Sequence, residues 1–297
     1  MSYLSLSNTS LVAIAISFVV ICIIIISLRI VTQIKAKQAL KEELAQHDNF
    51  AMGISFASEI SVVIATMAFL FDEISISTAQ SNPLKVILLI VLLFSFIKMW
   101  HLIHRKWILR RFNEEAAILK QNVCAALVDS GMLIANCILV LGLYTLTHTQ
   151  GFSNLLIASV SFFVLQGIFA LDSKIRENRF AKANQGASLQ SNFGLENTSI
   201  GIRYAGKSIG LALAAYAGLS SAAFQNGKMV ENLFTLVMHC GVMWLLLYCL
   251  TYIIKIISMP NIDTALEVDH QDNIGIACIE FAVFCAIGYL LISMFSI

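Results

Sequence analysis

Long apolar segments alternate with short polar ones along the whole chain. Each apolar segment is long enough to cross the hydrocarbon core of a bilayer as a helix. Together they leave no room for a separate soluble domain. The pattern therefore predicts an all-α polytopic membrane protein with eight transmembrane helices, near residues 10–31, 51–71, 84–104, 123–146, 154–171, 199–222, 230–257 and 274–296.

Composition supports this prediction. The 297 residues are 58% hydrophobic and only 12% charged, about half the charged fraction of an average soluble domain. The start of the chain has no basic segment and no small-residue cleavage site, so we expect its first apolar run to be a retained helix. The lipid bilayer is therefore the first expected partner, and the chain is expected to cross it several times.

The basic residues gather in alternate connections. Most of the 19 Lys and Arg residues lie in the first, third, fifth and seventh connections, whereas the opposite side has only Lys85 and Lys228. Lys and Arg accumulate in cytoplasmic loops, so both termini are predicted to face outward. The basic segment 105–111, RKWILRR, is interpreted as an interfacial anchor for anionic lipid headgroups, with Trp100 and Trp107 beside it. Because the net charge is only +1, no nucleic-acid partner is expected.

Four similar stretches recur at near-constant spacing, each with a polar residue followed by Asn and then an apolar helix. A unit contains two spans, so all four copies run in the same sense as parallel repeats. The asparagines are interpreted as N-caps of helix starts, with a direct functional role as the alternative. They are Asn49, Asn122, Asn197 and Asn273.

Small residues recur four and nine positions after each of these asparagines. Such residues let transmembrane helices approach closely. The sixth predicted helix extends this feature into a small-residue stripe, expected to be a close-packing face, at Gly206, Gly210, Ala214 and Gly218.

The Asn-led helices and two-span units resemble the YjfL-like bacterial inner-membrane family, also called domain of unknown function 350. ENTSIGIRYAGKSIGLALAAYAG (196–218) resembles the family pattern most closely, and 48–61 and 272–284 follow it more loosely. Ser58 and Ala282 stand where the family has Gly. Family members often have four spans, so the resemblance implies two four-helix modules in tandem, residues 1–150 and 151–297. The resemblance implies a multi-pass location in the bacterial inner (plasma) membrane. It implies no established activity, although some members have genes beside those of membrane-stress proteins.

Five charged residues fall inside the predicted repeat helices, where an ionised side chain is costly. Glu59 and Lys207 occupy equivalent positions in units one and three, and Asp129 and Glu280 in units two and four. The fifth charge, Arg203, lies one helical turn before Lys207.

Two interpretations of these charges stay open. They are either buried ion pairs that join the two halves, such as Glu59 with Lys207, or a polar pathway. In the pathway, Asp129 and Glu280 face each other with one of them protonated, as in proton and ion relays.

Other chemistry finds little support in the sequence. His101 and His104 are interpreted as interfacial, because a third metal ligand is not apparent. The seven cysteines form no CxxC pair and are expected to be buried, apolar thiols. No metal site, cofactor or catalytic motif is identified, so an enzyme is not expected.

Two functions follow. The first is transport of a proton, ion or small solute through a charged path between the repeats. The second is a membrane scaffold that recruits a cytoplasmic peripheral protein in envelope stress. A homo-oligomer is compatible with either function.

Overall fold

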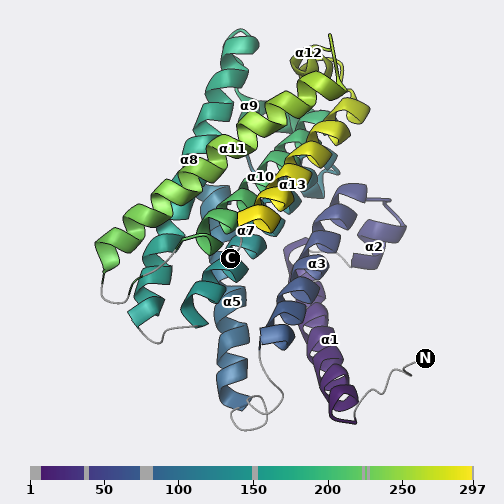
Figure 1. Cartoon of the computed structure of the whole chain (residues 1–297). Helices are drawn as coiled ribbons and strands as arrows, with labels where there is room; N and C mark the ends of the chain where they lie inside the picture. The colour runs from purple at the N-terminus through teal and green to yellow at the C-terminus, as the bar shows by residue number, and fades with distance from the viewer. Residues whose placement is uncertain are drawn as a thin grey trace, which may run out of the picture.

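A computed structural model describes residues 8–36, 40–73, 83–148, 153–222, 225 and 228–295. Lys37 of the first basic connection and the expected domain boundary at 150/151 lie outside these residues. The described residues form helices and no strand. The long helices are α1 (Asn8–Ala36), α3 (Phe50–Glu73), α5 (Pro83–Ile103), α7 (Val123–His148), α8 (Ser153–Ala183), α10 (Thr198–Ser220), α11 (Met229–Ser258) and α13 (Ile274–Phe295). The all-helical prediction is confirmed, and each expected apolar segment coincides with one of these long helices (Figure 1).

Six of the long helices are long and apolar enough to cross a membrane: α3, α5 with the turn that follows it, α7, α8, α11 and α13. The described apolar part of α1, Phe18–Ile34, is shorter. α10 is more polar because it carries Arg203, Lys207 and several Gly and Ser residues. Most of its residues are covered by neighbouring helices, so it needs no apolar face toward lipid.

Helices α3, α7, α10 and α13 pack side by side in a row, and α1, α5, α8 and α11 lie against that row. Within its span, α7 has 78% of its residues buried, whereas α11 has 22%. The two middle helices of the row, α7 and α10, are therefore the most buried part of the molecule, and the other long helices surround them (Figure 1).

Each helix of the row is preceded by a short helical segment. These segments are α2 (Leu40–Ala45), α6 (Glu114–Leu119), α9 (Leu189–Asn192) with the 3₁₀ turn η2 (Phe193–Leu195), and α12 (Thr264–Asp269). A π-helical turn, η1 (His104–Ile108), also lies between α5 and α6. We refer to the side of the bundle that carries these elements as the short-helix end.

The glycines of α10 lie where neighbouring backbones come closest. A Cβ atom on Gly206 would lie 2.5 Å from Phe281 Cα, and one on Gly210 would lie 2.7 Å from the Phe284 carbonyl oxygen. On Gly218 it would lie 2.8 Å from Cys240 Cα. Ala214, also in the stripe, is fully buried. Because these contacts involve backbone atoms, a larger residue would have to separate α10 from α13 or α11.

Candidate functional site

The four predicted asparagines all begin helices of the row. The Oδ1 atom of each accepts a hydrogen bond from the backbone N–H three residues later, at 2.8–3.2 Å. This is N-cap geometry, which satisfies one of the unpaired N–H groups of a helix start. The residue before each asparagine has a positive φ, an unusual backbone conformation for a residue other than Gly: Asp48, Gln121, Glu196 and Asp272.

The first charge cluster surrounds Asp129, which is 1% exposed on α7. Arg105, on η1, donates two hydrogen bonds of 2.9 Å to its two carboxylate oxygens. His101 Nε2 lies 2.5 Å from Asp129 Oδ1. A bidentate arginine is among the strongest partners of a carboxylate, so this cluster is compact and charge-compensated.

Two more titratable side chains extend this cluster. His104 is fully buried, and its Nε2 lies 3.2 Å from the Tyr204 hydroxyl of α10. Glu114, at the start of α6, is 1% exposed, and its Oε1 has no hydrogen-bond partner. Burial, reinforced by the negative charge of Asp129, raises the pKa of Glu114 from 4.5 to about 8. Glu114 is therefore mostly protonated at neutral pH.

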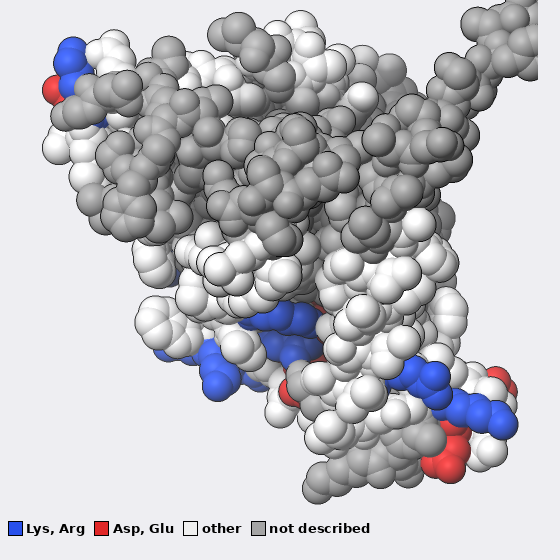
Figure 2. Space-filling model, turned by 90° about the horizontal axis from the view of Figure 1, so that it is seen from below, with Lys and Arg blue, Asp and Glu red and all other residues white. Residues whose placement is uncertain are grey.

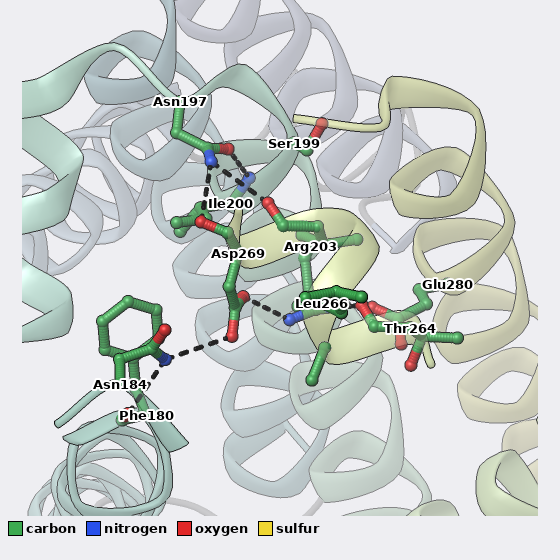
Figure 3. A network of polar contacts seen from close by, with 12 residues as sticks. Phe180, Asn184, Asn197, Ser199, Ile200, Arg203, Thr264, Leu266, Asp269 and Glu280 are labelled. Atoms are coloured by element: carbon green, nitrogen blue, oxygen red, sulfur yellow. Dashed lines mark hydrogen bonds and ion pairs between the residues drawn. The ribbon is translucent and has the colours of Figure 1, made fainter. Parts of the chain in front are cut away.

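The second charge cluster surrounds Glu280, which is 1% exposed on α13. Its carboxylate pairs with Lys255 of α11 and with Arg203 of α10. Arg203 also donates to Asp269 at 2.7 Å and to the Thr264 carbonyl, both on α12. Figure 3 shows Arg203 lying between Asp269 and Glu280, so that one guanidinium joins α10, α12 and α13.

A cavity of ≈ 390 Å³ lies beside the second cluster, between α8, α10, α11 and α12. We call it the basic cavity, because its charged lining residues are four cations and two carboxylates: Arg176, Arg179, Arg203, Lys207, Asp172 and Asp269. Aromatic side chains of Tyr204, Trp244 and Tyr248 complete the polar part of the wall.

Arg176 is 8% exposed and pairs with Asp172 at 2.6 Å. Its guanidinium carbon lies 4.4 Å from the centre of the Tyr204 ring, which is a favourable cation–π geometry. Trp244 Nε1 and the Tyr248 hydroxyl both donate to Asp172, at 3.1 and 2.7 Å. The Nε–H group of Arg176, however, is buried without a hydrogen-bond partner in the described structure.

Lys207 is the other distinctive side chain of the basic cavity. Its Nζ lies 5.7 Å from the centre of the Phe284 ring. Among the described contacts, Lys207 makes no ion pair with a carboxylate. The basic cavity thus contains more positive charge than its carboxylates compensate.

The structure pairs the predicted intramembrane charges differently from either sequence interpretation. Glu59 lies 2.5 Å from Lys98 of α5, not beside Lys207. Asp129 and Glu280 have separate partners in separate clusters, so the expected facing carboxylate pair is wrong. Arg203 joins Glu280, and Lys207 lies in the cavity nearby.

Several side chains expected at the interface or in the core are placed elsewhere. His101 and His104 are buried rather than interfacial, and Trp100 is fully buried against Phe162 and Phe169. Arg105 points back to Asp129 because η1 follows α5 directly. The apolar thiols are also not all buried, since Cys249 and Cys278 are exposed. Within the described residues, no three His, Cys, Asp or Glu side chains are grouped to hold a metal ion.

Asp172 and Arg176 were not among the site residues expected from the sequence. The predicted fifth span ends at residue 171, but α8 continues to Ala183 and carries both residues into the bundle. Their spacing of four residues was the available signal, since residues four apart share a helix face.

Comparison with known proteins gives a match for the first half of the chain. Residues 5–144 match the family described as Domain of Unknown Function (DUF350). Neither the curated proteins nor the solved structures contain a match. The matched region extends from the N-terminal segment nearly to the end of α7 and includes the first charge cluster. Residues 5–144 are therefore similar to the DUF350 family, the family that the sequence resemblance named.

Proposed function

We propose an inner-membrane protein with eight spans, built from four parallel two-helix units, with both termini outside. Six apolar helices support this topology directly, and α10 completes the row between α7 and α13. The recurring short helix, positive φ and Asn cap support the four-unit description. The DUF350 match over the first two units supports the division into two modules, residues 1–150 and 151–297.

Accessibility of single cysteines to a membrane-impermeant thiol reagent in intact cells tests the topology. Lys228→Cys should react from outside, and Arg110→Cys should react only after the membrane is opened. The opposite pattern, or reaction of both from one side, would overturn the proposed orientation.

We propose that this protein binds a small anion in the basic cavity and moves it across the membrane. The observation that carries the proposal is that Lys207, beside Arg176 and Arg203 in a cavity of ≈ 390 Å³, has no carboxylate partner among the described contacts. Including the adjacent Lys255 and Glu280 leaves the excess unchanged, because these two charges cancel. Uncompensated charge in a membrane interior is costly, so an anion that supplies the missing charge would be bound favourably.

The unpartnered Nε–H of Arg176 supports the same assignment. A buried donor without a partner costs about 1–3 kcal/mol, and an anion or an associated water could accept its hydrogen bond. Arg176 is held in place by Asp172 and stacked on Tyr204. The donor is therefore positioned in advance, and little side-chain entropy would be lost on binding.

Anion-dependent thermal stability of the purified protein tests binding. Chloride, phosphate and small carboxylates would be compared at equal ionic strength, in wild type and in Lys207→Met. A bound anion raises the unfolding temperature by mass action, and this rise should be lost in Lys207→Met. Lys228→Met, which removes an exposed lysine elsewhere, should keep it. Equal responses of wild type and Lys207→Met would overturn the proposal.

The scaffold function keeps one specific observation in its favour. A groove of ≈ 850 Å³ at the short-helix end is lined by Trp107, Arg110, Arg111 and Lys174, among others. Figure 2 shows Lys and Arg side chains gathered in parts of an otherwise mostly uncharged described surface. Because Arg105 is used by Asp129, the residues to neutralise are Lys106, Arg110 and Arg111. Loss of recruitment of a peripheral protein in that variant, with anion binding intact, would favour the scaffold function.

A further inference from the structure

The three junctions of the row use the same polar contact. In each, the side-chain amide of the capping asparagine donates to a backbone carbonyl in the short helical segment that precedes the next helix of the row. The distances are 3.4 Å for Asn49 to Ile118, 2.9 Å for Asn122 to Phe193, and 3.1 Å for Asn197 to Val268. The contact always runs from one unit to the unit that follows it.

The helix packing repeats in the same direction. A Cβ atom on Gly131, nine residues after Asn122, would lie 2.5 Å from Ala205, eight residues after Asn197. Gly206 meets Phe281 in the equivalent positions of the next junction. A Cβ atom on Gly201, four residues after Asn197, would lie 2.9 Å from the carbonyl oxygen of Cys124, two residues after Asn122. One face of a row helix, at positions two and nine after its Asn, thus packs against positions four and eight of the next helix.

Each end of the row leaves one of these two faces uncovered. The face at positions two and nine is uncovered on α13, and the face at positions four and eight is uncovered on α3. At the interior junctions these positions are buried, with Phe281 alone partly so. On α13, which has no following unit, Gly275 and Ala282 are exposed. On α3, which has no preceding unit, Ala57 is exposed, and a Cβ atom on Gly53 would meet only Leu44 of the adjacent α2 within 4 Å.

The polar groups at the two ends are complementary as well. Asp272 accepts a hydrogen bond from Ser199 N–H of the preceding unit at 2.7 Å. The equivalent acid of the first unit is Asp48, which is exposed, and the equivalent N–H group of the last unit is that of exposed Gly275. The Asn273 amide has no following unit, and within the described part of the chain it donates to Glu267 of its own α12.

We propose that α13 of one copy packs against α3 of a second copy, as a fourth junction of the same kind. Ala282 would meet Ala57, Gly275 would meet Gly53, and Asp48 would accept from the Gly275 N–H. Small residues at both ends allow the close approach that drives helix association in membranes. The contact joins two different surfaces, so it produces a ring if the rotation closes and a filament if it does not. This inference uses the unit topology proposed above but is independent of the anion site.

Disulfide cross-linking between two tagged forms of the full chain in native membranes tests this contact. The background would carry serine at Cys22, Cys249, Cys278 and Cys285. Ala57→Cys on one form and Ala282→Cys on the other should give a mixed dimer under mild oxidation. Pairing Ala57→Cys with Val242→Cys, an exposed position on α11, should not. Absence of the Ala57–Ala282 cross-link, or an equally strong cross-link from Ala57→Cys alone, would overturn the head-to-tail contact.

A second measurement follows the oligomeric state of a variant in which the contact between α13 and α3 is disrupted. Ala282→Trp should convert the purified oligomer to a monomer of about the chain mass, 32.7 kDa. Its unfolding temperature and helix content should match those of the wild type held as a monomer by dilution. Tyr289→Trp, at another exposed site on α13, is the matched control and should stay oligomeric. A wild type that is monomeric at every concentration, or an Ala282→Trp variant with unchanged mass, would contradict the proposal.

Discussion

The two charge clusters place a buried carboxylate at the same position of the repeat, but they differ in how its charge is balanced. Asp129 and Glu280 stand seven residues after their capping asparagines, and each pairs with a cation from the end of the helix before. Around Asp129, the bidentate pair with Arg105 compensates the charge of the carboxylate. Around Glu280, Arg203 and Lys207 of α10 add positive charge beside a cavity. The difference favours a stabilising role for the first cluster and supports the proposed anion site beside the second.

Asp129→Asn should give the largest loss of stability. It removes the bidentate partner of Arg105 and leaves Arg105 the longer contact to Glu115, at 3.8 Å. Breaking a buried ion pair by removing one partner costs ~3–5 kcal/mol. Glu280→Gln should cost clearly less, because Arg203 keeps Asp269 and water or an anion can enter the adjacent cavity. Denaturant unfolding in mixed micelles measures both. Equal losses of stability in the two variants would contradict the proposed difference between the two clusters.

Glu114 gives the first cluster a pH dependence. Its pKa is raised from 4.5 to about 8 in the folded state, so between these values the folded protein holds a proton that the unfolded chain has released. The free energy of unfolding therefore falls as pH rises through this window, by at most ~1.4 kcal/mol per pH unit. Above pH 8 the effect of Glu114 is constant.

Glu114→Gln should remove this contribution. The variant should match the wild type below pH 4.5 and become progressively more stable than the wild type as the pH rises to 8. The difference in unfolding free energy between the two proteins, measured at pH 5 and pH 8, isolates Glu114 from other titrating groups. A difference that does not change with pH would contradict a buried, protonated Glu114.

Lys207→Met should change the free energy of unfolding in the opposite direction from substitutions in the first cluster. Removing a covered cation that has no carboxylate partner should raise stability by about 1 kcal/mol in anion-free buffer, since stabilising substitutions occur where function requires a costly group. Arg105→Met should instead destabilise, because Asp129 loses its bidentate partner. Destabilisation by Lys207→Met would indicate that Lys207 is a structural charge.

Substitution of two capping asparagines should give the smallest difference in stability between the two modules, and these two sites are the most closely matched. Asn122→Ala removes both an N-cap and the bond to Phe193 in the second module. Asn273→Ala removes an N-cap and a bond to its own α12. A lost N-cap costs ~0.5–2 kcal/mol, and Asn122→Ala should cost about 1 kcal/mol more, because a buried carbonyl also loses its partner. Equal effects would show that the bond to the next unit contributes little stability.

The sequence predicts the long helices well because the apolar runs are long and the capping asparagines mark four of the starts. It also identifies the residues of the close-packed stripe on α10. It could not predict the ion pairs, since these depend on the rotation of each helix about its axis. The π-helical turn at His104–Ile108 is the clearest case: it directs Arg105 of an apparently interfacial basic segment to Asp129. Asp172 and Arg176 were missed because charge was taken to end the span, whereas α8 continues with its charges buried.

The most direct test of the anion site is anion flux in proteoliposomes. Wild type, Lys207→Met and Lys228→Met would be reconstituted at equal protein density, and efflux of chloride, phosphate and small carboxylates would be followed under an imposed gradient. The account predicts flux of at least one anion that is lost in Lys207→Met and kept in Lys228→Met. Absence of flux in folded wild type for all three classes, or undiminished flux in Lys207→Met, would contradict it.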